Sequence, residues 1–146
     1  METVYINSPL GITKIIGDEN GIAVISVSDV GTNEVSTEVP EVLQQAVLQL
    51  NEYFEGKRSH FEVPLFTTGT EFQEKVWQLL REIPMGEIRT YKQQSEILGN
   101  PKAIRAVGTA NGINKIAILI PCHRVIGANG ELVGYAGGIW RKQRLL

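Results

Sequence analysis

Residues 70–73 read Thr-Glu-Phe-Gln and residues 90–93 read Thr-Tyr-Lys-Gln, and these two tetrapeptides decide the fold of the second half of the chain. Each is a capping box, in which a threonine hydroxyl and a glutamine amide satisfy free backbone donors at the start of a helix. The first helix should stop at residues 84–86, Pro-Met-Gly, and the second at Gly99. The buried stripe of the first helix is expected to be Phe72, Val76, Leu79, Leu80 and Ile83, with Trp77 close to it.

A third helix is expected from about residue 101 to residue 111, because Asn100 suits an N-cap and Pro101 suits a first helical turn. Two short helices joined by a tight Gly-Asn-Pro turn make a helix-turn-helix candidate, although many proteins contain such a corner without binding DNA. The last helix is rich in alanine and glycine, and only Lys102 and Arg105 project long charged chains from it. Close packing against a neighbouring helix, or approach to a narrow surface such as a DNA minor groove, would each explain this composition. Base readout in a major groove would need more polar side chains.

The first third of the chain reads as antiparallel strands. Apolar residues alternate at 4–6, continue at 12–16 and form a longer run at 22–28, with turns at 7–11 and 18–21 between them. The second turn ends in Asn-Gly, a strong turn signal because both residues tolerate positive φ. At least one face of this small sheet is apolar and needs a cover.

The next helix is the expected cover. It should begin near Pro40 and end at Gly56. Its apolar positions at helical spacing are Val42, Leu43, Ala46, Val47, Leu50 and Phe54. The predicted fold class is therefore α+β, with a small N-terminal antiparallel sheet and its covering helix in residues 1–66. A mainly helical domain with the helix-turn-helix follows in residues 67–146.

Cys122 is the only cysteine in the chain, and it stands in the run Ile-Leu-Ile-Pro-Cys-His-Arg-Val at residues 118–125. One sulfur cannot form an internal disulfide or a multi-cysteine metal site, so Cys122 is either an inert core residue or a nucleophile. Because the apolar run ends at a proline, the thiol is expected where a strand passes into a turn. His123 and Arg124 are groups that favour a thiolate. Free cysteine is also among the most buried residue types, so the motif alone leaves both interpretations open.

Composition and charge indicate an ordinary soluble globular protein. The chain has 146 residues, of which 21% are charged, and a mean hydropathy of −0.05. No apolar stretch approaches membrane-spanning length, the first residues are not a signal peptide, and one unpaired cysteine fits a reducing compartment, so we expect a cytoplasmic protein. Residues 1–66 carry three basic and ten acidic groups, a net charge of −7, whereas residues 67–146 carry eleven and six, a net charge of +5. The basic half either meets a polyanion or is merely an unevenly charged surface.

Several motifs, in order, resemble those of the O6-alkylguanine-DNA alkyltransferases. The matching segments are Phe-Gln and Val-Trp at 72–77, Ile-Pro-Met-Gly at 83–86, Thr-Tyr at 90–91, Arg-Ala-Val-Gly at 105–108, Asn114, Pro-Cys-His-Arg-Val at 121–125 and Tyr-Ala-Gly-Gly at 135–138. The resemblance covers about residues 69–146. The first third matches only in general character.

The resemblance implies a suicide DNA repair protein, a methylated-DNA–protein-cysteine S-methyltransferase. It would take an alkyl group from O6 of guanine onto Cys122, with O4 of thymine as a further candidate substrate. The O6 atom lies inside the duplex, so the damaged base must first be flipped out of the stack. His123 would accept the thiol proton through a water, and Tyr91 would donate its hydroxyl proton towards the guanine. Asn114 would brace the turn that holds Cys122. Tyr91 could instead simply pack against the helices, and Asn114 could cap an ordinary loop.

The resemblance also implies how the protein meets double-stranded DNA. Arg105 would enter the stack and fill the space left by the flipped base, although contact with a phosphate is the alternative. The expected DNA-contacting residues are Lys102, Arg105, Ala106, Thr109, Ala110, Tyr135, Ala136 and Gly137, of which the last three would line the guanine pocket. No cofactor is implied. No metal ion is implied either, because the zinc site that some relatives have in the N-terminal region needs cysteines and histidines, and residues 1–66 contain only His60. The protein is expected to act as a monomer.

Family members usually carry a glutamate three residues after a Leu-Leu pair, hydrogen-bonded to the histidine, whereas the sequence here ends at Leu146. Either the sequence is shortened, or another group orients the histidine. We therefore expect a less stabilised imidazolium and slower transfer than in a version extended by that glutamate. The competing interpretations are a non-catalytic protein that senses alkylated DNA, a cysteine hydrolase and a transcription regulator. Such sensors typically have tryptophan in place of the cysteine.

Overall fold

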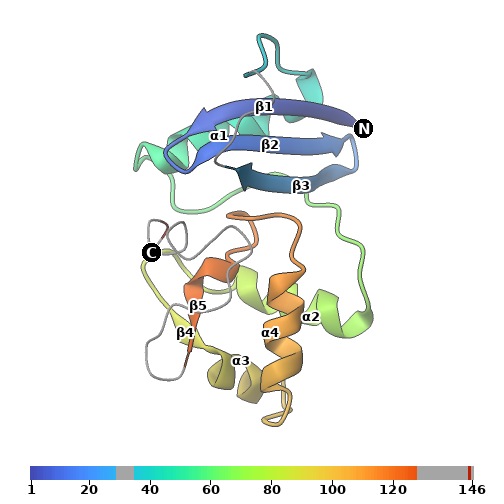
Figure 1. The fold of residues 1–146 in the computed structure, drawn as a ribbon, viewed down its shortest axis with the longest axis vertical. Coiled ribbons are helices and arrows are strands. Elements are labelled where there is room, and N and C mark those ends of the chain that lie inside the picture. Colours follow the sequence, from blue (N-terminus) through green and yellow to red (C-terminus); the bar gives the residue numbers. More distant parts are fainter. Residues whose placement is uncertain (29–34, 128–144, 146) are drawn as a thin grey trace. The chain divides into compact units, whose positions relative to one another are not determined.

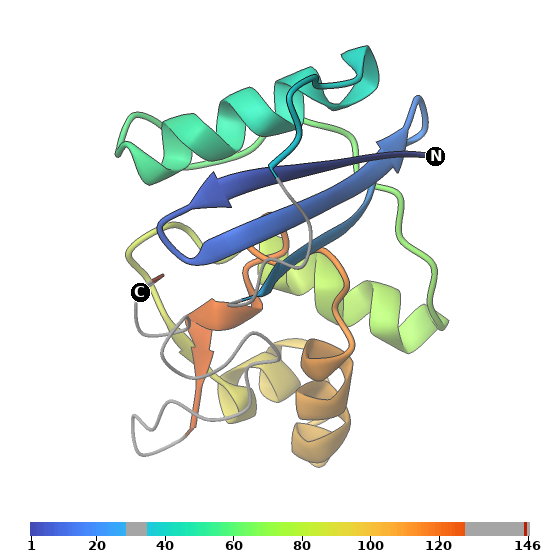
Figure 2. The same ribbon diagram turned by 45° about the horizontal axis from the view of Figure 1, so that its top comes forward.

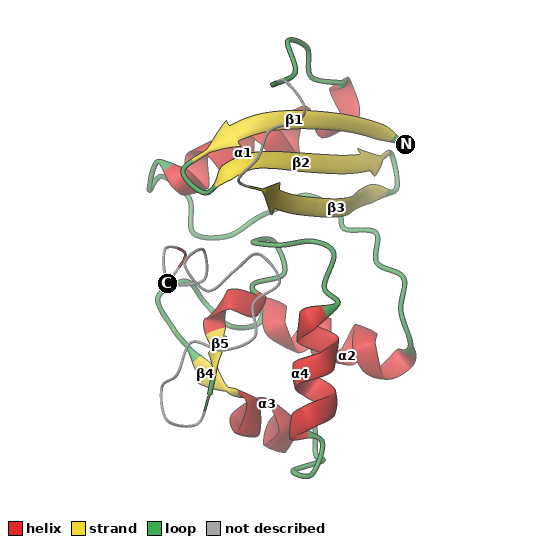
Figure 3. Ribbon diagram, viewed as in Figure 1, coloured by secondary structure: helices red, strands yellow, loops and turns green. Residues whose placement is uncertain are grey.

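The structure is a computed structural model that describes residues 1–28, 35–127 and 145 (Figure 1). The chain divides into two compact units. The first contains Met1–Thr67 and the short segment Lys115–Ala117, and the second contains Thr68–Asn114 and Ile118–Leu146. The first unit holds an antiparallel sheet and the second holds mainly helices, so the predicted α+β fold class is confirmed (Figure 3).

The first unit is built on a three-stranded antiparallel meander. The strands β1 (Glu2–Ser8), β2 (Gly11–Asp18) and β3 (Gly21–Ser28) pair in sequence order. Residues that alternate along the strands share a face, and one face carries the buried Val4, Ile6, Ile15 and Ile25. Figure 2 shows the helix α1 (Gln44–Phe54) lying across the sheet, after a short 3₁₀ turn η1 (Glu41–Leu43). The expected cover of the sheet is therefore present.

The apolar stripe of α1 differs in part from the prediction. Leu43, Ala46 and Leu50 are buried as expected, whereas Val42 is 43% exposed. Tyr53, which was not in the predicted stripe, is buried instead. Val42 leaves the stripe because residues 41–43 form a 3₁₀ turn with about three residues per turn, so the spacing of 3.6 residues starts only at Gln44. Tyr53 follows Leu50 by three residues, which places both on one face of the helix.

The hairpin turn between β2 and β3 also differs from the prediction. Glu19 and Asn20 are its two loop residues, and Gly21 is already the first residue of β3. Gly21 has a φ of +138°, and a Cβ at this position would lie 2.8 Å from the carbonyl oxygen of Pro64. The glycine therefore permits close approach of residues 64–65 to the sheet and does not form a two-residue Asn-Gly turn.

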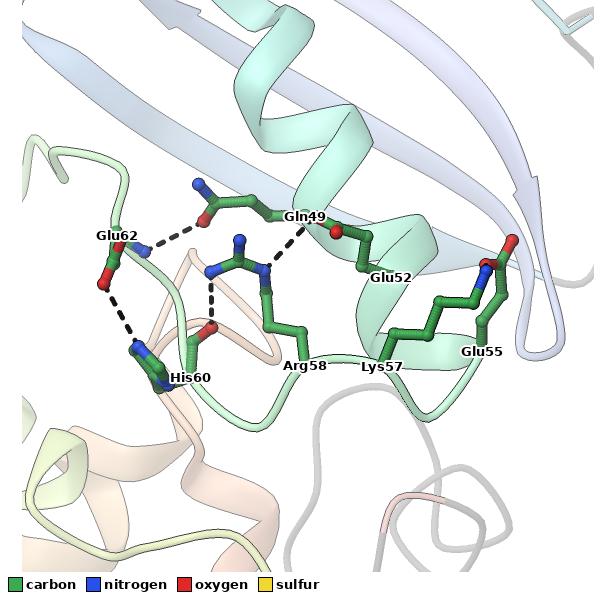
Figure 4. Close-up of polar contacts among 7 residues, drawn as sticks. All are labelled: Gln49, Glu52, Glu55, Lys57, Arg58, His60 and Glu62. Carbon is green, nitrogen blue, oxygen red and sulfur yellow. Dashed lines mark hydrogen bonds and ion pairs between the residues drawn. The ribbon is translucent and has the colours of Figure 1, made fainter.

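The segment after α1 is tied back to the helix by polar contacts (Figure 4). The buried side chain of Gln49 accepts a hydrogen bond from the backbone N–H of Glu62 at 2.9 Å. Around it, Arg58 pairs with Glu52 at 3.4 Å, and His60 lies 3.2 Å from Glu62. The last pair is more than two-thirds exposed, so it contributes little stability, whereas the bond to Gln49 fixes the path of the chain.

In the second unit, both capping boxes predicted from the sequence are present. Thr70 and Gln73 cap α2 (Glu71–Arg81), and Thr90 and Gln93 cap α3 (Tyr91–Ile97). The buried face of α2 contains Val76, Trp77, Leu79 and Leu80, while Phe72 is only partly buried. Among the described residues, no helix combines the length and the apolar character that crossing a bilayer requires.

The third helix of this unit, α4, spans Ile104–Gly112, so its predicted start at residue 101 is wrong. Its N-cap is Ala103, without a side-chain cap. The Asn100 carbonyl accepts a hydrogen bond from the Ala103 N–H at 3.0 Å, which closes a turn before the helix begins. Lys102 therefore belongs to the turn and not to the helix.

The predicted strand before Pro121 is absent as well. The apolar residues 118–120 form turns, and Ile118 has a φ of +71°, which is rare for a β-branched residue. The neighbouring segment 115–117 belongs to the first unit, where Ile116 makes an isolated parallel bridge to Ile25 of β3. Because hydrophobicity alone does not separate a strand from a buried turn, the sequence pattern was ambiguous here.

Candidate active site

A short parallel ladder holds the candidate site together. The two-residue strands β4 (Arg89–Thr90) and β5 (Val125–Ile126) pair in register. The first leads directly into α3, whose first residue is Tyr91, and the second directly follows the 3₁₀ turn η2 (Cys122–Arg124). The ladder therefore brings Tyr91 and Cys122 together, although they are far apart in the sequence.

Arg124, the last residue of η2, ties this turn to the segment that follows α2. This side chain is only 7% exposed, and its Nη1 donates a hydrogen bond of 2.7 Å to the carbonyl oxygen of Ile83, just after α2. A buried guanidinium needs such partners because removing its charge from water is costly. His123, the middle residue of η2, is fully buried. Arg124 thus has a structural role that the sequence did not indicate.

Cys122 lies at the start of η2 and is 8% exposed. The amide nitrogen of Asn114 is 3.4 Å from its sulfur and also donates a hydrogen bond of 3.0 Å to the carbonyl oxygen of Ile120. Between Asn114 and Cys122 in the sequence, Ile118 adopts a left-handed backbone conformation. Backbone strain of this kind persists only where the surrounding structure enforces it, and here Ile118 is 2% exposed.

Tyr91 is partly buried and interacts electrostatically with Cys122. Burial raises the pKa of its hydroxyl above the ordinary 10.0, and negative charge on Cys122 raises that pKa further, while the Asn111 amide lowers it. The phenol therefore keeps its proton at neutral pH. A protonated hydroxyl close to a nucleophilic sulfur is a suitable proton donor for a leaving group.

The raised pKa of Tyr91 predicts how stability depends on pH. Below pH 10 the phenol is protonated in both the folded and the unfolded state, and its contribution is fully present. As pH rises above 10, the unfolded chain releases the proton first, so stability is lost until the folded-state pKa is passed. We expect the free energy of unfolding to fall more between pH 9 and 11 in the wild type than in Tyr91→Phe, measured by urea denaturation. Equal losses would contradict the raised pKa.

The predicted DNA-contacting residues divide into three groups. Lys102, Arg105, Ala106 and Thr109 are exposed. Ala110 is 3% exposed, and its carbonyl oxygen accepts a hydrogen bond from the indole of Trp77 at 2.9 Å. This places Ala110 on the inner side of α4, where it supports the helix. Tyr135, Ala136 and Gly137 lie outside the described residues.

Three features of the site were not found from the sequence. They are the hydrogen bond from the Trp77 indole to Ala110, the hydrogen bond from the buried Arg124 to Ile83, and Asn111, a buried amide near the end of α4 that interacts with Tyr91. The sequence places Trp77 close to a buried stripe but does not indicate its partner, and no spacing pattern indicates Asn111. Across residues 1–28 and 35–127, no group of three or more histidine, cysteine, aspartate or glutamate side chains could hold a metal ion.

A buried thiol contacted by an amide and electrostatically coupled to a phenol, together with a helix of small residues, is the arrangement expected of a cysteine-dependent enzyme. Comparison with known proteins gives its family. Residues 1–67 match the ribonuclease-like domain of 6-O-methylguanine DNA methyltransferase, and residues 71–146 match the DNA-binding domain. The methylated-DNA–protein-cysteine methyltransferase of Methanosarcina acetivorans is 48% identical over 146 residues, covering 95% of this chain and 92% of the relative.

Solved structures agree with this result. The crystal structure of Mycobacterium tuberculosis O6-methylguanine methyltransferase matches with a TM-score of 0.87 and 42% identity, over 99% of this chain and 90% of that one. The crystal structure of M. tuberculosis OGT in complex with DNA matches with a TM-score of 0.87 and 45% identity, over 97% of this chain and 88% of that one. The chain belongs to the 6-O-methylguanine DNA methyltransferase family. Its activity is DNA repair by transfer of a methyl group to a cysteine.

Proposed function

We propose that Cys122 is the acceptor cysteine and that the protein removes methyl groups from O6 of guanine in duplex DNA, once per molecule. The observation that carries the proposal is the position of the Cys122 sulfur, held by Asn114 at 3.4 Å and electrostatically coupled to Tyr91. This combines a nucleophile, a group that orients it and a proton donor. Because the thioether product cannot ionise to a thiolate, and nothing in the proposed reaction removes its methyl group, each molecule reacts only once.

The proposed transfer begins with the thiol proton of Cys122. His123 takes the thiol proton through a water, which leaves a thiolate. The sulfur attacks the methyl carbon, so that the S–C bond forms as the C–O6 bond breaks and the electron pair passes to guanine. Tyr91 gives its proton to the guanine ring, and this neutralises the leaving group. Burial of Cys122 and His123 excludes bulk water from the reacting atoms.

We propose that α3 and α4 act as a helix-turn-helix on double-stranded DNA. The exposed positions Arg105, Ala106 and Thr109 lie on one face of α4, with Lys102 in the turn before it. Residues 67–146 carry a net charge of +5, which suits a polyanion. Arg105 takes the place of the flipped base, and Tyr135, Ala136 and Gly137 line the pocket that receives it. The protein acts as a cytoplasmic monomer, and O4-methylthymine is a second substrate.

Two glycines of α4 provide a test of the DNA-facing helix. A Cβ added at Gly108 would lie 3.9 Å from Cε1 of Tyr91, an ordinary contact, so packing against the described residues does not require glycine here. We expect Gly108→Ala to be more stable by about 0.5–1 kcal/mol, because alanine favours helix, and to bind duplex DNA with the wild-type affinity, because its methyl group would lie against Tyr91 and not on the exposed face of the helix.

Gly112→Ala is the matched variant, at the last residue of the same helix, where an added Cβ meets no described atom within 4 Å. Gly112 is exposed and shares a helix face with Arg105 and Thr109, so this variant should also gain stability but should bind duplex DNA more weakly, because its methyl group obstructs the backbone approach. Thermal unfolding and fluorescence anisotropy measure the two quantities. Undiminished DNA affinity of Gly112→Ala would show that α4 does not approach DNA through this position.

The proposed function is tested by the fate of the damaged base. Excess protein is mixed with a duplex that contains one O6-methylguanine, and the nucleosides are analysed by mass spectrometry after digestion. We expect O6-methylguanine to be replaced by guanine without loss of the base, and the amount repaired to stop at the amount of protein when DNA is in excess. Release of a free base, or unchanged O6-methylguanine, would reject the proposal. A duplex with O4-methylthymine tests the second substrate.

A further inference from the structure

Asn111 is a buried amide near the end of α4. Its side chain is 3% exposed, and neither its Nδ2 nor its Oδ1 has a hydrogen-bond partner among the residues that the structure describes. A buried amide without a partner destabilises a folded protein, so such groups are rare in native structures. Where one persists, it commonly belongs to a functional site.

Asn111 shares a face of α4 with the residue that contacts Tyr91. Gly108 stands one turn earlier, and a Cβ there would lie 3.9 Å and 4.0 Å from Cε1 and Cδ1 of the Tyr91 ring. Residues three apart are neighbours on a helix surface, so the ring lies along the face that Gly108 and Asn111 form. The Asn111 amide also lowers the pKa of Tyr91. The amide therefore lies close enough to the phenol to interact with it.

We propose that Asn111 is a positioning residue for Tyr91, whose side-chain amide donates a hydrogen bond to the tyrosine oxygen as the phenol gives up its proton to the departing guanine. This rests on the proposed role of Tyr91 in methyl transfer. When the C–O6 bond breaks and the Tyr91 proton passes to the guanine, a phenolate oxygen remains. An N–H donor beside it stabilises that charge more than it stabilises the neutral hydroxyl, so the interaction is strongest in the transition state.

A second buried amide supplies a matched control. Gln94 on α3 is fully buried, and its Nε2 likewise has no hydrogen-bond partner in the described part of the second unit. Its Oε1, however, accepts a hydrogen bond of 3.2 Å from Arg89. Gln94 thus reproduces the burial and the unpaired nitrogen of Asn111 without the interaction with Tyr91.

The test is a double-mutant cycle on the rate of single-turnover methyl transfer. We expect Asn111→Leu to transfer about tenfold more slowly than the wild type, since hydrogen bonds to a charged oxygen are among the stronger ones. In a Tyr91→Phe background the same change should have no further effect. Asn111→Leu should also unfold at the same temperature as the wild type or higher, because leucine of similar size replaces an unpaired amide.

Two further measurements distinguish the possible failures. An ultraviolet absorbance titration, with Tyr91→Phe as the reference, should show a higher Tyr91 pKa in Asn111→Leu than in the wild type, whatever the reaction. Gln94→Met should transfer at the wild-type rate. The inference is overturned if Asn111→Leu transfers normally while Tyr91→Phe is slow, or if the two changes slow transfer independently. If Tyr91→Phe itself transfers normally, the role of Tyr91 in the proposed function fails, and the inference fails with it. Methylation of Cys122 would still be seen in that case.

Discussion

Cys122→Ala is expected to lose methyl transfer completely and to retain the wild-type affinity for duplex DNA that contains O6-methylguanine. Removing the sulfur removes the atom that receives the methyl group, whereas the exposed face of α4 that we propose as the DNA contact is untouched. The side chain is buried, with 8% exposed, but only its sulfur is removed, so the unit should remain folded. The repair assay and fluorescence anisotropy with the same duplex measure the two quantities.

Thermal unfolding of Cys122→Ala is the control for its fold. A variant that unfolds at the wild-type temperature, binds the damaged duplex and does not repair it would separate chemistry from recognition. Residual single-turnover repair above the background of protein-free DNA would show that another group accepts the methyl group. In that case Cys122 would be a buried structural residue.

Arg105→Ala is expected to repair O6-methylguanine in a normal duplex about 30- to 100-fold more slowly than the wild type. Flipping a base costs a few kcal/mol of unstacking and unpairing, and in our proposal the guanidinium recovers part of that cost by filling the vacated space. The defect should shrink when the damaged base is in single-stranded DNA, where it is already unpaired. Single-turnover rates on the two substrates test this.

Lys102→Ala is the matched control for Arg105→Ala. Both side chains are exposed and positively charged, but Lys102 lies in the turn before α4. We expect its loss to weaken binding by a similar factor on both substrates, as removal of a phosphate contact does. If Arg105→Ala also lost the same factor on both substrates, Arg105 would be a phosphate contact and not the residue that replaces the base.

Local sequence signals predicted the elements whose start is set by a side chain. The capping boxes at Thr70 and Thr90 are formed by neighbouring residues, so α2 and α3 begin where the sequence indicates. The start of α4 was misplaced because the Asn100 backbone closes a separate turn there. The run at 118–120 predicts a strand end but forms a buried turn, because its hydrophobicity is equally compatible with both.

The sequence predicted the site residues that belong to a motif, and it did not predict those that are recognised only by their tertiary contacts. Cys122 and Asn114 stand in a recognisable order, and the structure places them in contact. Asn111, by contrast, is one more small polar residue in a helix of small residues. Its importance depends on which face of α4 meets Tyr91, and that is fixed by the packing of α3 against α4.

The central claim, that Cys122 receives one methyl group from O6 of guanine and is consumed, is tested most directly by the mass of the protein itself. Wild-type protein is incubated with excess duplex containing O6-methylguanine, and its intact mass and proteolytic peptides are measured. We predict a gain of one CH2 on every molecule, located on the peptide that contains Cys122, and no further repair after that point. An unchanged protein mass with repaired DNA, or repair that continues beyond one event per molecule, would contradict the account.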